Sequence, residues 1–303
     1  MNKKITAGIL SAVVMASAVL SPVSALADSV EGKTYLSLGA DLTEGEKATV
    51  LDLLDVNPDE LYNYDVYEVT NQQEHEYLDS YVESSLIGDR AQSSVKVTGK
   101  EEGYGIQVVT YNISYCTIGM YQNALATAGI ENAEVIVAGP YSMSGTAALV
   151  GAIEAYSRMT GDVIEPELAD GATNELVVTS DVAKSIGSSE KAEELIAAVK
   201  EIVIANEYDD PEQIDGVISD VANQLEISLS NEDRQMIREL MQKLAGLNLN
   251  LDTIKEQASA LYERISHLDL SQYGITQENV DGILASVKQF FIGLFEVIKG
   301  LFE

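Results

Sequence analysis

The first half of the chain alternates short apolar runs of strand length with longer segments that carry the helical period. Each helix in such a pattern returns the chain to a neighbouring strand, so we expect an α/β fold with a mixed, mostly parallel sheet. The glycine-flanked segment 99–105 joins two of these strands and predicts a hairpin. The expected strands are 35–38, 66–69, 94–98, 106–111 and 135–138, and the expected helices are 43–54, 72–82, 118–128 and 145–159.

The second half of the chain contains no convincing strand pattern. Apolar residues recur there every three to four positions, as they do on one face of an amphipathic helix. Four such stripes begin at Ile214, Ile237, Leu251 and Val280. Because these helices can bury their stripes only against one another, we expect a small all-α bundle.

The composition changes sharply between the two halves. Twelve of the fifteen tyrosines precede residue 186, whereas all four phenylalanines lie in the last fourteen residues. Gly187, Ser188 and Ser189 stand at the change and are typical of a connecting segment. We therefore expect a signal peptide over 1–27, an α/β domain over 28–186 and a helical domain over 187–303.

The N-terminal residues have the three parts of a bacterial export signal. Lys3 and Lys4 give a positive start, residues 5–20 form an apolar core too short to span a bilayer, and residues 25–27 (Ala-Leu-Ala) match a cleavage site. We expect the mature chain to begin at Asp28 and to contain no transmembrane segment. The protein is predicted to be secreted, or to be held on the cell envelope without a covalent anchor.

The net charge indicates which kinds of partner the protein can bind, and the cysteine count indicates whether disulfides can stabilise the fold. The formal net charge is −31, which repels nucleic acid phosphates and anionic lipid and leaves cations, basic proteins and neutral ligands compatible. Cys116 is the single cysteine, so no intramolecular disulfide can form and the core must stabilise the fold.

Polar residues follow the predicted strands at four turns. In an open parallel sheet these turns gather at the carboxyl edge, where ligands usually bind and where helix N–H groups favour an anion or a polar oxygen. The same residue types also cap helices without binding anything, which is the alternative interpretation. The predicted ligand-binding residues are Asp41, Asn71, Asn112, Ser144, Gly145 and Thr146.

Two of these turns have the spacing of a capping box, in which two side chains satisfy the free N–H groups at a helix start. Thr43 pairs with Glu46 in the first turn, and Asn71 pairs with Glu74 in the second. The spacing predicts that a helix starts at each place.

No complete catalytic set is present in the sequence. The hydrolase elbow G-x-S-x-G is absent around Ser142 and around Ser144, and the chain has only His75 and His267 as histidine bases. We therefore expect no catalytic residues, although a hydrolase that uses carboxylates or Ser144 in another geometry stays an alternative.

Metal and cofactor motifs are equally incomplete. His75 and Asp79 could share a helix face but supply only two ligands. Residues 55–66 start like a calcium loop but lack the glycine at the sixth position and the glutamate at the twelfth. We expect neither a metal nor a cofactor.

The C-terminal residues 290–303 carry an unusually apolar helical face. Seven large side chains share it, and the stretch is too short and too charged to span a membrane. It is either the closing helix of the bundle or a surface that contacts lipid, a second subunit or a protein partner in the envelope. The seven residues are Phe290, Phe291, Leu294, Phe295, Ile298, Leu301 and Phe302.

The order and content of four motifs resemble the YpuA-like family of secreted Firmicute proteins, a domain of unknown function. The resemblance spans roughly residues 30–270, and it implies export and an extracellular or envelope setting without supplying an activity. The motifs are residues 37–43 (SLGADLT), 69–71 (VTN), 112–114 (NIS) and 144–149 (SGTAAL).

Taken together, these patterns predict a secreted or envelope-associated protein that binds a small polar ligand or an envelope component without catalysis. The first alternative is an envelope-acting hydrolase. The second is a purely structural or assembly factor, which a closed crevice would favour.

Overall fold

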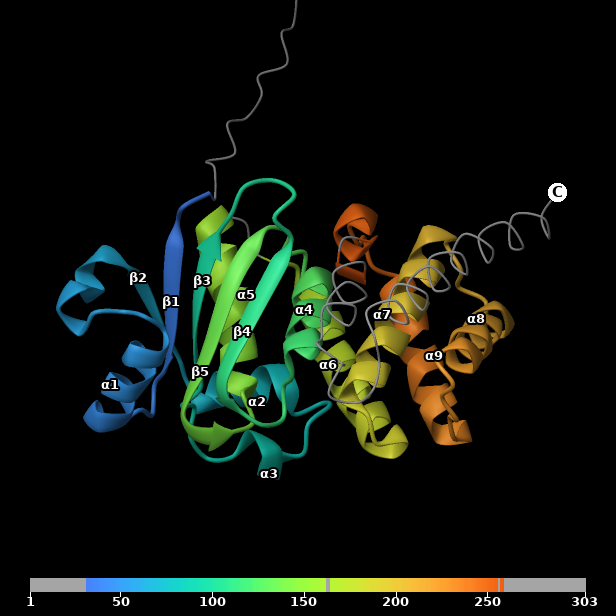
Figure 1. Ribbon diagram of the computed structural model, residues 1–303, viewed down its shortest axis with the longest axis horizontal. Coiled ribbons are helices and arrows are strands. Elements are labelled where there is room, and N and C mark those ends of the chain that lie inside the picture. The colour runs from blue at the N-terminus through green and yellow to red at the C-terminus, as the bar shows by residue number, and fades with distance from the viewer. Residues whose placement is uncertain (1–30, 162–163, 256, 259–303) are drawn as a thin grey trace, which may run out of the picture.

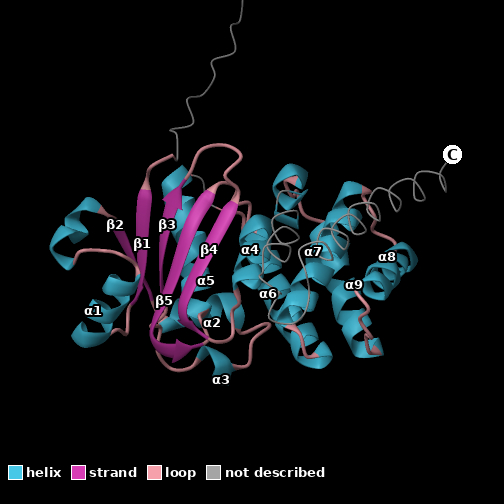
Figure 2. Ribbon diagram, viewed as in Figure 1, coloured by secondary structure: helices cyan, strands magenta, loops and turns pink. Residues whose placement is uncertain are grey.

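The computed structural model describes residues 31–161, 164–255 and 257–258. These residues form one five-stranded sheet that is covered by helices and continues on one side into a helical group, as Figures 1 and 2 show. The strands are β1 (Thr34–Gly39), β2 (Asp65–Val69), β3 (Ser94–Gly99), β4 (Ile106–Ile113) and β5 (Ala133–Met143). The helices over the first half are α1 (Glu44–Leu53), η1 (a 3₁₀ helix, Pro58–Asn63), α2 (Asn71–Leu78), α3 (Ser84–Ile87), α4 (Ile118–Thr127) and α5 (Thr146–Thr160). They are followed by α6 (Pro166–Ile186), α7 (Ser189–Ala205), α8 (Pro211–Gln224) and α9 (Asn231–Ala245).

The strand order is β2-β1-β3-β5-β4. The pairs β1–β2 and β4–β5 are parallel, whereas β3 is antiparallel to both of its neighbours, β1 and β5. The sheet is therefore mixed, as predicted. Four of the five strands run in the same direction, and only β3 runs against them. Because β3 lies inside the sheet, however, half of the neighbouring pairs are antiparallel, so the prediction of a mostly parallel sheet is only partly confirmed. One consequence is that β1, β2, β4 and β5 all end at the same edge of the sheet.

The predicted hairpin between residues 94–98 and 106–111 is wrong, because β5 lies between β3 and β4. Helix α4 returns the chain from β4 to the parallel strand β5, which also pairs with β3. The valines of β5 are fully buried, whereas Val109 and Tyr111 of β4 are about two-fifths exposed. The more apolar strand thus takes the interior position, and β4 becomes an edge.

Alternate side chains of the strands face opposite layers of helices. Val95, Val97 and Val135 belong to the apolar cluster that α4 and α5 share with the sheet. Leu36 and Leu38 instead pack with α1 on the other face. Helix α5 crosses β1 and β3 directly, and it lies behind the strands in Figure 1.

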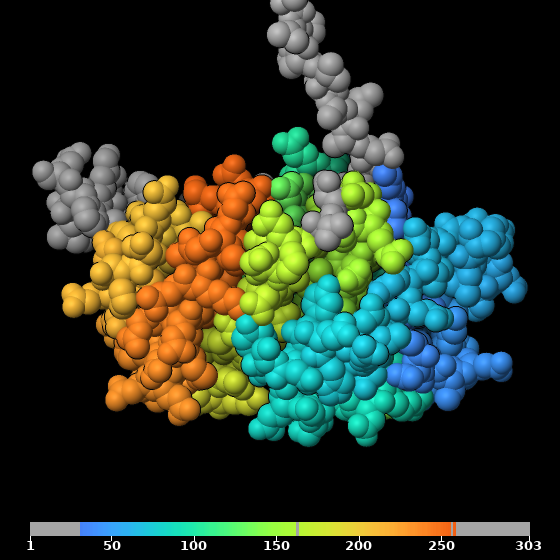
Figure 3. Space-filling view, turned by 180° about the vertical axis from the view of Figure 1, so that it is seen from behind, coloured from blue at the N-terminus to red at the C-terminus, as the bar shows by residue number. Residues whose placement is uncertain are grey.

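Helix α6 was not among the expected elements, and it links the sheet to the helical group. It starts with Pro166 in its first turn, has Gly187 as its C-terminal cap and packs against α4, α7 and α9. One apolar cluster consequently runs from β3 and β5 through α6 to α9. In the view from behind, the yellow-green, gold and orange segments form a continuous surface (Figure 3).

The helical prediction for the second half holds where the structure describes it. The stripes that begin at Ile214 and Ile237 are the buried faces of α8 and α9, and residues 251–255 are helical. The boundary expected near residues 187–189 coincides with the turn between α6 and α7, where Ser188 caps α7. The division into two domains stays a prediction.

A buried ion pair joins α4, α6 and α7. The ammonium of Lys200 lies 2.7 Å from the carboxylate of Glu175, and both side chains are almost wholly shielded from solvent. Lys200 also donates to the carbonyl of Asn123 and to the hydroxyl of Thr127, each at 3.1 Å. Burial raises the pKa of Glu175, and the charge of Lys200 opposes that rise.

Three predictions fall on parts of the chain that the structure does not describe. These are the export signal, the helical stripe that begins at Val280 and the Phe-rich residues 290–303. Among the described helices, none combines the length and the apolar character needed to cross a bilayer.

Candidate functional site

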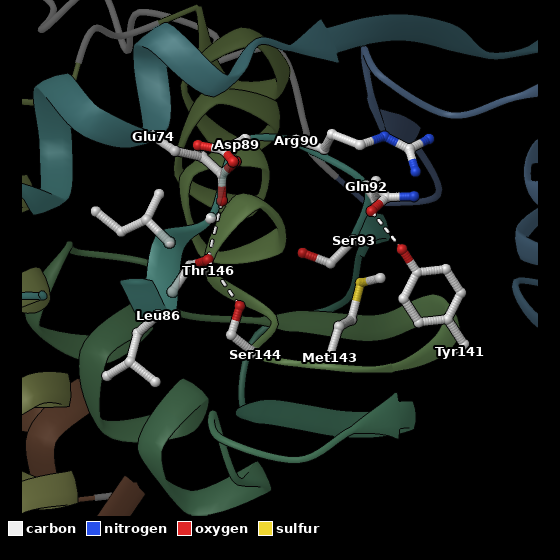
Figure 4. Close-up of a pocket in the computed structure, with 12 residues that line it drawn as sticks. Glu74, Leu86, Asp89, Arg90, Gln92, Ser93, Tyr141, Met143, Ser144 and Thr146 are labelled. Carbon is white, nitrogen blue, oxygen red and sulfur yellow. Dashed lines mark hydrogen bonds between the residues drawn. The ribbon is translucent and has the colours of Figure 1, made fainter. Parts of the chain in front are cut away.

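A cavity of about 320 Å³ opens at the edge of the sheet where β1, β2 and β5 end. Its walls come from α2, α3, the loop that precedes β3, the end of β5 and the start of α5. Figure 4 shows the polar side chains converging on it from these separate segments. The lining residues are Glu74, Leu86, Ile87, Gly88, Asp89, Arg90, Gln92, Ser93, Tyr141, Met143, Ser144 and Thr146.

Glu74 reaches the cavity because α2 begins one residue earlier than the capping pattern predicts. Thr70 is the capping residue, and its box partner is Gln73, not the predicted pair of Asn71 with Glu74. Glu74 therefore lies one position beyond the box, on the face of α2 that packs toward α5. The first predicted box, Thr43 with Glu46, is present at the start of α1.

The carboxyl group of Glu74 is buried, and hydroxyl and amide donors hold it. The Thr146 hydroxyl donates to one of its oxygens at 2.9 Å, and the Asn71 amide approaches the other at 3.4 Å. Only about 1% of the residue is exposed. Burial raises the pKa of Glu74 to about 7, although both hydrogen bonds oppose the rise.

Ser144 and Thr146 extend this arrangement along the start of α5. Their hydroxyls lie 3.1 Å apart, so a hydrogen-bonded series runs from Ser144 through Thr146 to Glu74, as the dashed lines in Figure 4 mark. Gly145, between them, has φ of +96°. Its carbonyl accepts the Tyr121 hydroxyl at 2.6 Å, and a side chain there would collide with that hydroxyl. A glycine is therefore needed to bring both hydroxyls into the cavity.

The opposite wall of the cavity carries Arg90, Gln92 and Tyr141. The Tyr141 hydroxyl donates to Gln92 at 2.7 Å, and its ring is about half exposed. Arg90 donates to Glu46 at 2.8 Å and to the carbonyl of Asp41 at 2.6 Å. The N–H of Thr43 and the guanidinium of Arg90 lower the pKa of Glu46 to about 2, so this arginine faces a permanent negative charge.

The six residues predicted from the sequence occupy different places. Ser144 and Thr146 line the cavity, and Gly145 shapes the turn between them. Asn71 and Asp41 hold the loop that forms one wall: the Asn71 amide donates to the carbonyl of Gly88 at 3.0 Å, and the Asp41 carboxylate accepts the N–H of Ala91 at 2.8 Å.

Asn112 does not line the cavity. It lies at the irregular end of β4 with φ of +59°, and its amide donates to the carbonyl of Gly139 at 3.0 Å. Because β4 is the edge strand beyond β5, its end is separated from the loop that precedes β3. Its hydrogen bond joins the irregular end of β4 to β5.

Sequence reasoning missed six polar lining residues. Glu74 was visible in the sequence but was assigned to a helix cap. Four of them precede β3, the antiparallel strand, so the rule that sites form at carboxyl ends of strands does not select Asp89, Arg90, Gln92 and Ser93. Tyr141 lies in an extension of β5 that runs five residues beyond the predicted strand, to Met143.

The polar groups of the cavity do not form a metal centre in the described part of the chain. No group of three or more histidine, cysteine, aspartate or glutamate side chains is arranged there to hold a metal ion. His75 and Asp79 do share a helix face and lie 2.6 Å apart, as an exposed pair outside the cavity.

Comparison with known proteins places the chain in a family without supplying an activity. Residues 38–261 match the family described as "Protein of unknown function (DUF1002)". A full-length relative, "Uncharacterized protein YpuA" of Bacillus subtilis (strain 168), is 35% identical over 302 residues, which cover 99% of this chain and 100% of the relative. No solved structure matches the chain significantly. Since the family match spans most of the chain and the relative aligns along its whole length, this protein belongs to the DUF1002 family, to which its resemblance to YpuA-like proteins pointed.

Proposed function

We propose that this protein is exported and binds a small polar ligand in the cavity beside Glu74, without chemical turnover. The observation that carries the proposal is a buried carboxyl group on the wall of a cavity that four hydroxyl-bearing side chains also line. Concave sites with a few convergent polar groups are the usual form of small-molecule sites. A carboxyl group with a raised pKa in such a place is also a common mark of function.

A ligand screen tests this proposal. The mature protein would be screened against small polar molecules by thermal shift, together with a Ser144→Ala, Tyr141→Ala double variant. Both positions line the cavity, and neither side chain is fully buried, so the double variant should fold. Thr49→Ala is the matched control because it removes an exposed hydroxyl from α1, away from the cavity.

We expect a shift in the wild type and in the control that is strongly reduced in the double variant. Equal shifts in all three proteins would place the binding elsewhere and would exclude the cavity.

Export is a separate part of the proposal, and it rests on the sequence. Mass spectrometry of the natural N-terminus should find Asp28 as the first residue of protein recovered outside the cytoplasm. An intact Met1 on protein found only in cytosol would contradict it.

The proposed contact of residues 290–303 with a partner or the envelope also rests on the sequence. Cell fractionation should separate the full chain from a variant that ends at Gln289 if that contact exists.

A second candidate is an envelope-acting hydrolase, and the hydrogen-bonded series from Ser144 to Glu74 favours it. The geometry ranks it lower, because Thr146 stands between the serine and the carboxyl group. A general base must lie within hydrogen-bond reach of the proton that it accepts. Turnover of cell-wall fragments by the wild type, and its loss in Ser144→Ala, would establish hydrolysis in place of binding alone.

A further inference from the structure

The positive charge beside the cavity has a partner of opposite charge, whereas the buried acidic group Glu74 has no lysine or arginine partner in the described part of the chain. Arg90 is already engaged by Glu46 and by the carbonyl of Asp41, so its positive charge is largely neutralised. Among the described residues, neither a lysine nor an arginine forms an ion pair with Glu74. Asp89 adds a second acidic side chain to the wall. A ligand that brings a positive charge to Glu74 would therefore meet a net negative site in a strongly acidic protein.

The remaining lining groups are suited to hydroxyl groups and to the face of a ring. The Ser93 hydroxyl accepts the N–H of Ala148 at 3.0 Å, which leaves its own proton free to donate. Ser144 lines the same cavity, at the end of the hydrogen-bonded series. Tyr141, which is about half exposed, also lines the cavity and offers an aromatic ring against which the apolar face of a sugar ring can lie. Figure 4 shows Ser93 between the Glu74 side and the Tyr141 side of the cavity.

We infer that this cavity binds a hydroxylated primary amine of the amino-sugar class, with the ammonium group on the carboxylate of Glu74 and ring hydroxyls on Ser93 and Ser144. The inference deepens the proposed function and depends on it. An ammonium–carboxylate contact in a desolvated site is a charge-assisted hydrogen bond, which is stronger than a neutral one. The amine therefore contributes most of the selectivity.

Binding should also displace a proton from Glu74. The pKa of this group is near 7, so much of it is protonated at neutral pH, and an adjacent ammonium favours the ionised form. The groups that interact with Glu74 by hydrogen bond or through their charge are Asn71 and His75 on α2, Asp41 after β1, Cys116 and Tyr121 around the start of α4, and Thr146 on α5. Burial raises the pKa of both Cys116 and Tyr121, so neither one exchanges a proton near neutral pH.

The test compares three sugars that differ only at one ring substituent. D-glucosamine carries an ammonium, D-glucose a hydroxyl and N-acetyl-D-glucosamine a neutral amide at that position. The mature protein would be titrated with each by isothermal calorimetry at about pH 6, in two buffers of different ionisation enthalpy, which counts the protons released. We expect glucosamine to bind at least about tenfold tighter than the other two and to release protons.

Two glutamine variants provide the comparison. Glu74→Gln keeps the shape and removes the charge, so it should bring the affinity for glucosamine down to that for glucose and abolish proton release. Glu76→Gln is the matched control, since Glu76 is an exposed residue of the same helix and its loss should change neither quantity. If Glu74→Gln fails to fold, two measurements on the wild type still test the inference: the relative affinities of the three sugars and the number of protons released on binding.

The outcomes separate this inference from the proposed function. Equal affinity for the three sugars, unchanged glucosamine binding by Glu74→Gln, or no binding of any of the three would overturn the assignment to amino sugars. The proposed binding of a polar ligand would still be tested by the thermal-shift screen, which includes ligands without an ammonium group. A ligand that shifts the wild type but not the Ser144→Ala, Tyr141→Ala variant would support that proposal on its own. Failure of that screen as well would remove both.

Discussion

The hydroxyl of Thr146 donates to the carboxyl group of Glu74 at 2.9 Å, although the two residues are 72 positions apart in the chain. Thr146 opens α5 and Glu74 lies in the first turn of α2, so the contact fixes the starts of the two helices against each other. The contact is buried, and it forms the inner wall of the cavity. A change in the charge of Glu74 must therefore affect both the stability of the fold and the binding properties of the site.

The free energy of unfolding should fall as the pH rises from about 4.5 to about 7. The folded pKa of Glu74 lies near 7 and its ordinary value is 4.5, so the folded chain binds more protons than the unfolded chain in that window. The contribution of Glu74 is complete below the window and lost above it, with a limit of ~3 kcal/mol at about 1.4 kcal/mol per pKa unit. Urea denaturation at about pH 5 and about pH 8 measures the difference.

Glu74→Gln isolates this effect, because the amide cannot ionise and nearly preserves the shape. The variant should match the wild type at the lower pH and exceed its stability at the higher pH. Glu76→Gln, on the exposed side of the same helix, should show no such dependence. A pH profile of Glu74→Gln that is parallel to that of the wild type would mean that Glu74 is solvated and ionised throughout.

Local patterns in the sequence predicted much of the fold. Helix α6 was missed, and the error in strand order is non-local. The cap at Thr43, the helix that starts near Gly145 and the stripe of α9 each depend on residues within one or two turns, and each is present. The position of β5 between β3 and β4 depends instead on which strand can be buried on both faces. Strand order therefore depends on the relative hydrophobicity of strands far apart in the sequence, and the apolar pattern within one strand does not predict it.

The same reasoning explains which of the predicted site residues the sheet brings together. The parallel directions of β1, β2 and β5 bring Asp41, Asn71 and Ser144 to one edge, as the turn residues predicted. Glu74 was missed as a lining residue, because a capping role explained it equally well before the register of α2 was known. Arg90 was missed, because no local signal marks a loop that enters an antiparallel strand.

Loss of one partner of the buried ion pair should destabilise the fold more than loss of both. Lys200→Met leaves Glu175 buried without its cation, which should cost ~3–5 kcal/mol. Combining it with Glu175→Leu removes the uncompensated charge and should restore most of that loss. Chemical denaturation of the two single variants and the double variant completes the cycle.

An exposed ion pair supplies the control for that cycle. Lys184 and Asp181 lie 3.0 Å apart on the surface of α6, and Lys184→Met should cost less than about 1 kcal/mol. Equal costs for Lys200→Met and Lys184→Met would show that Glu175 reaches water or another donor in the folded protein.

Gly145→Ala should be considerably more disruptive than Gly129→Ala. Both glycines have positive φ, at +96° and +85°, so both substitutions carry the same backbone strain of about 1 kcal/mol. The added carbon at Gly145 would lie 2.5 Å from the Tyr121 hydroxyl, whereas the one at Gly129 meets open space. The collision should add about 1–3 kcal/mol, measured as the difference between the two variants in urea. Similar costs would indicate that Tyr121 moves aside freely.

Cys116 should resist alkylation in the folded protein and react readily when the protein is unfolded. Only about 1% of the residue is exposed, and burial raises the pKa of its thiol to about 12, while the thiolate is the reactive form. Iodoacetamide labelling at about pH 8, followed by mass spectrometry, should therefore be slow in native buffer and fast in denaturant.

The thiol also reports on the cavity wall, because Cys116 and Tyr121 both lie beside Gly145. Gly145→Ala should speed the labelling in native buffer, whereas Gly129→Ala should leave it nearly unchanged. Rapid labelling of the wild type would mean that the start of α5 opens to solvent, and the buried setting of Glu74 would then have to open with it.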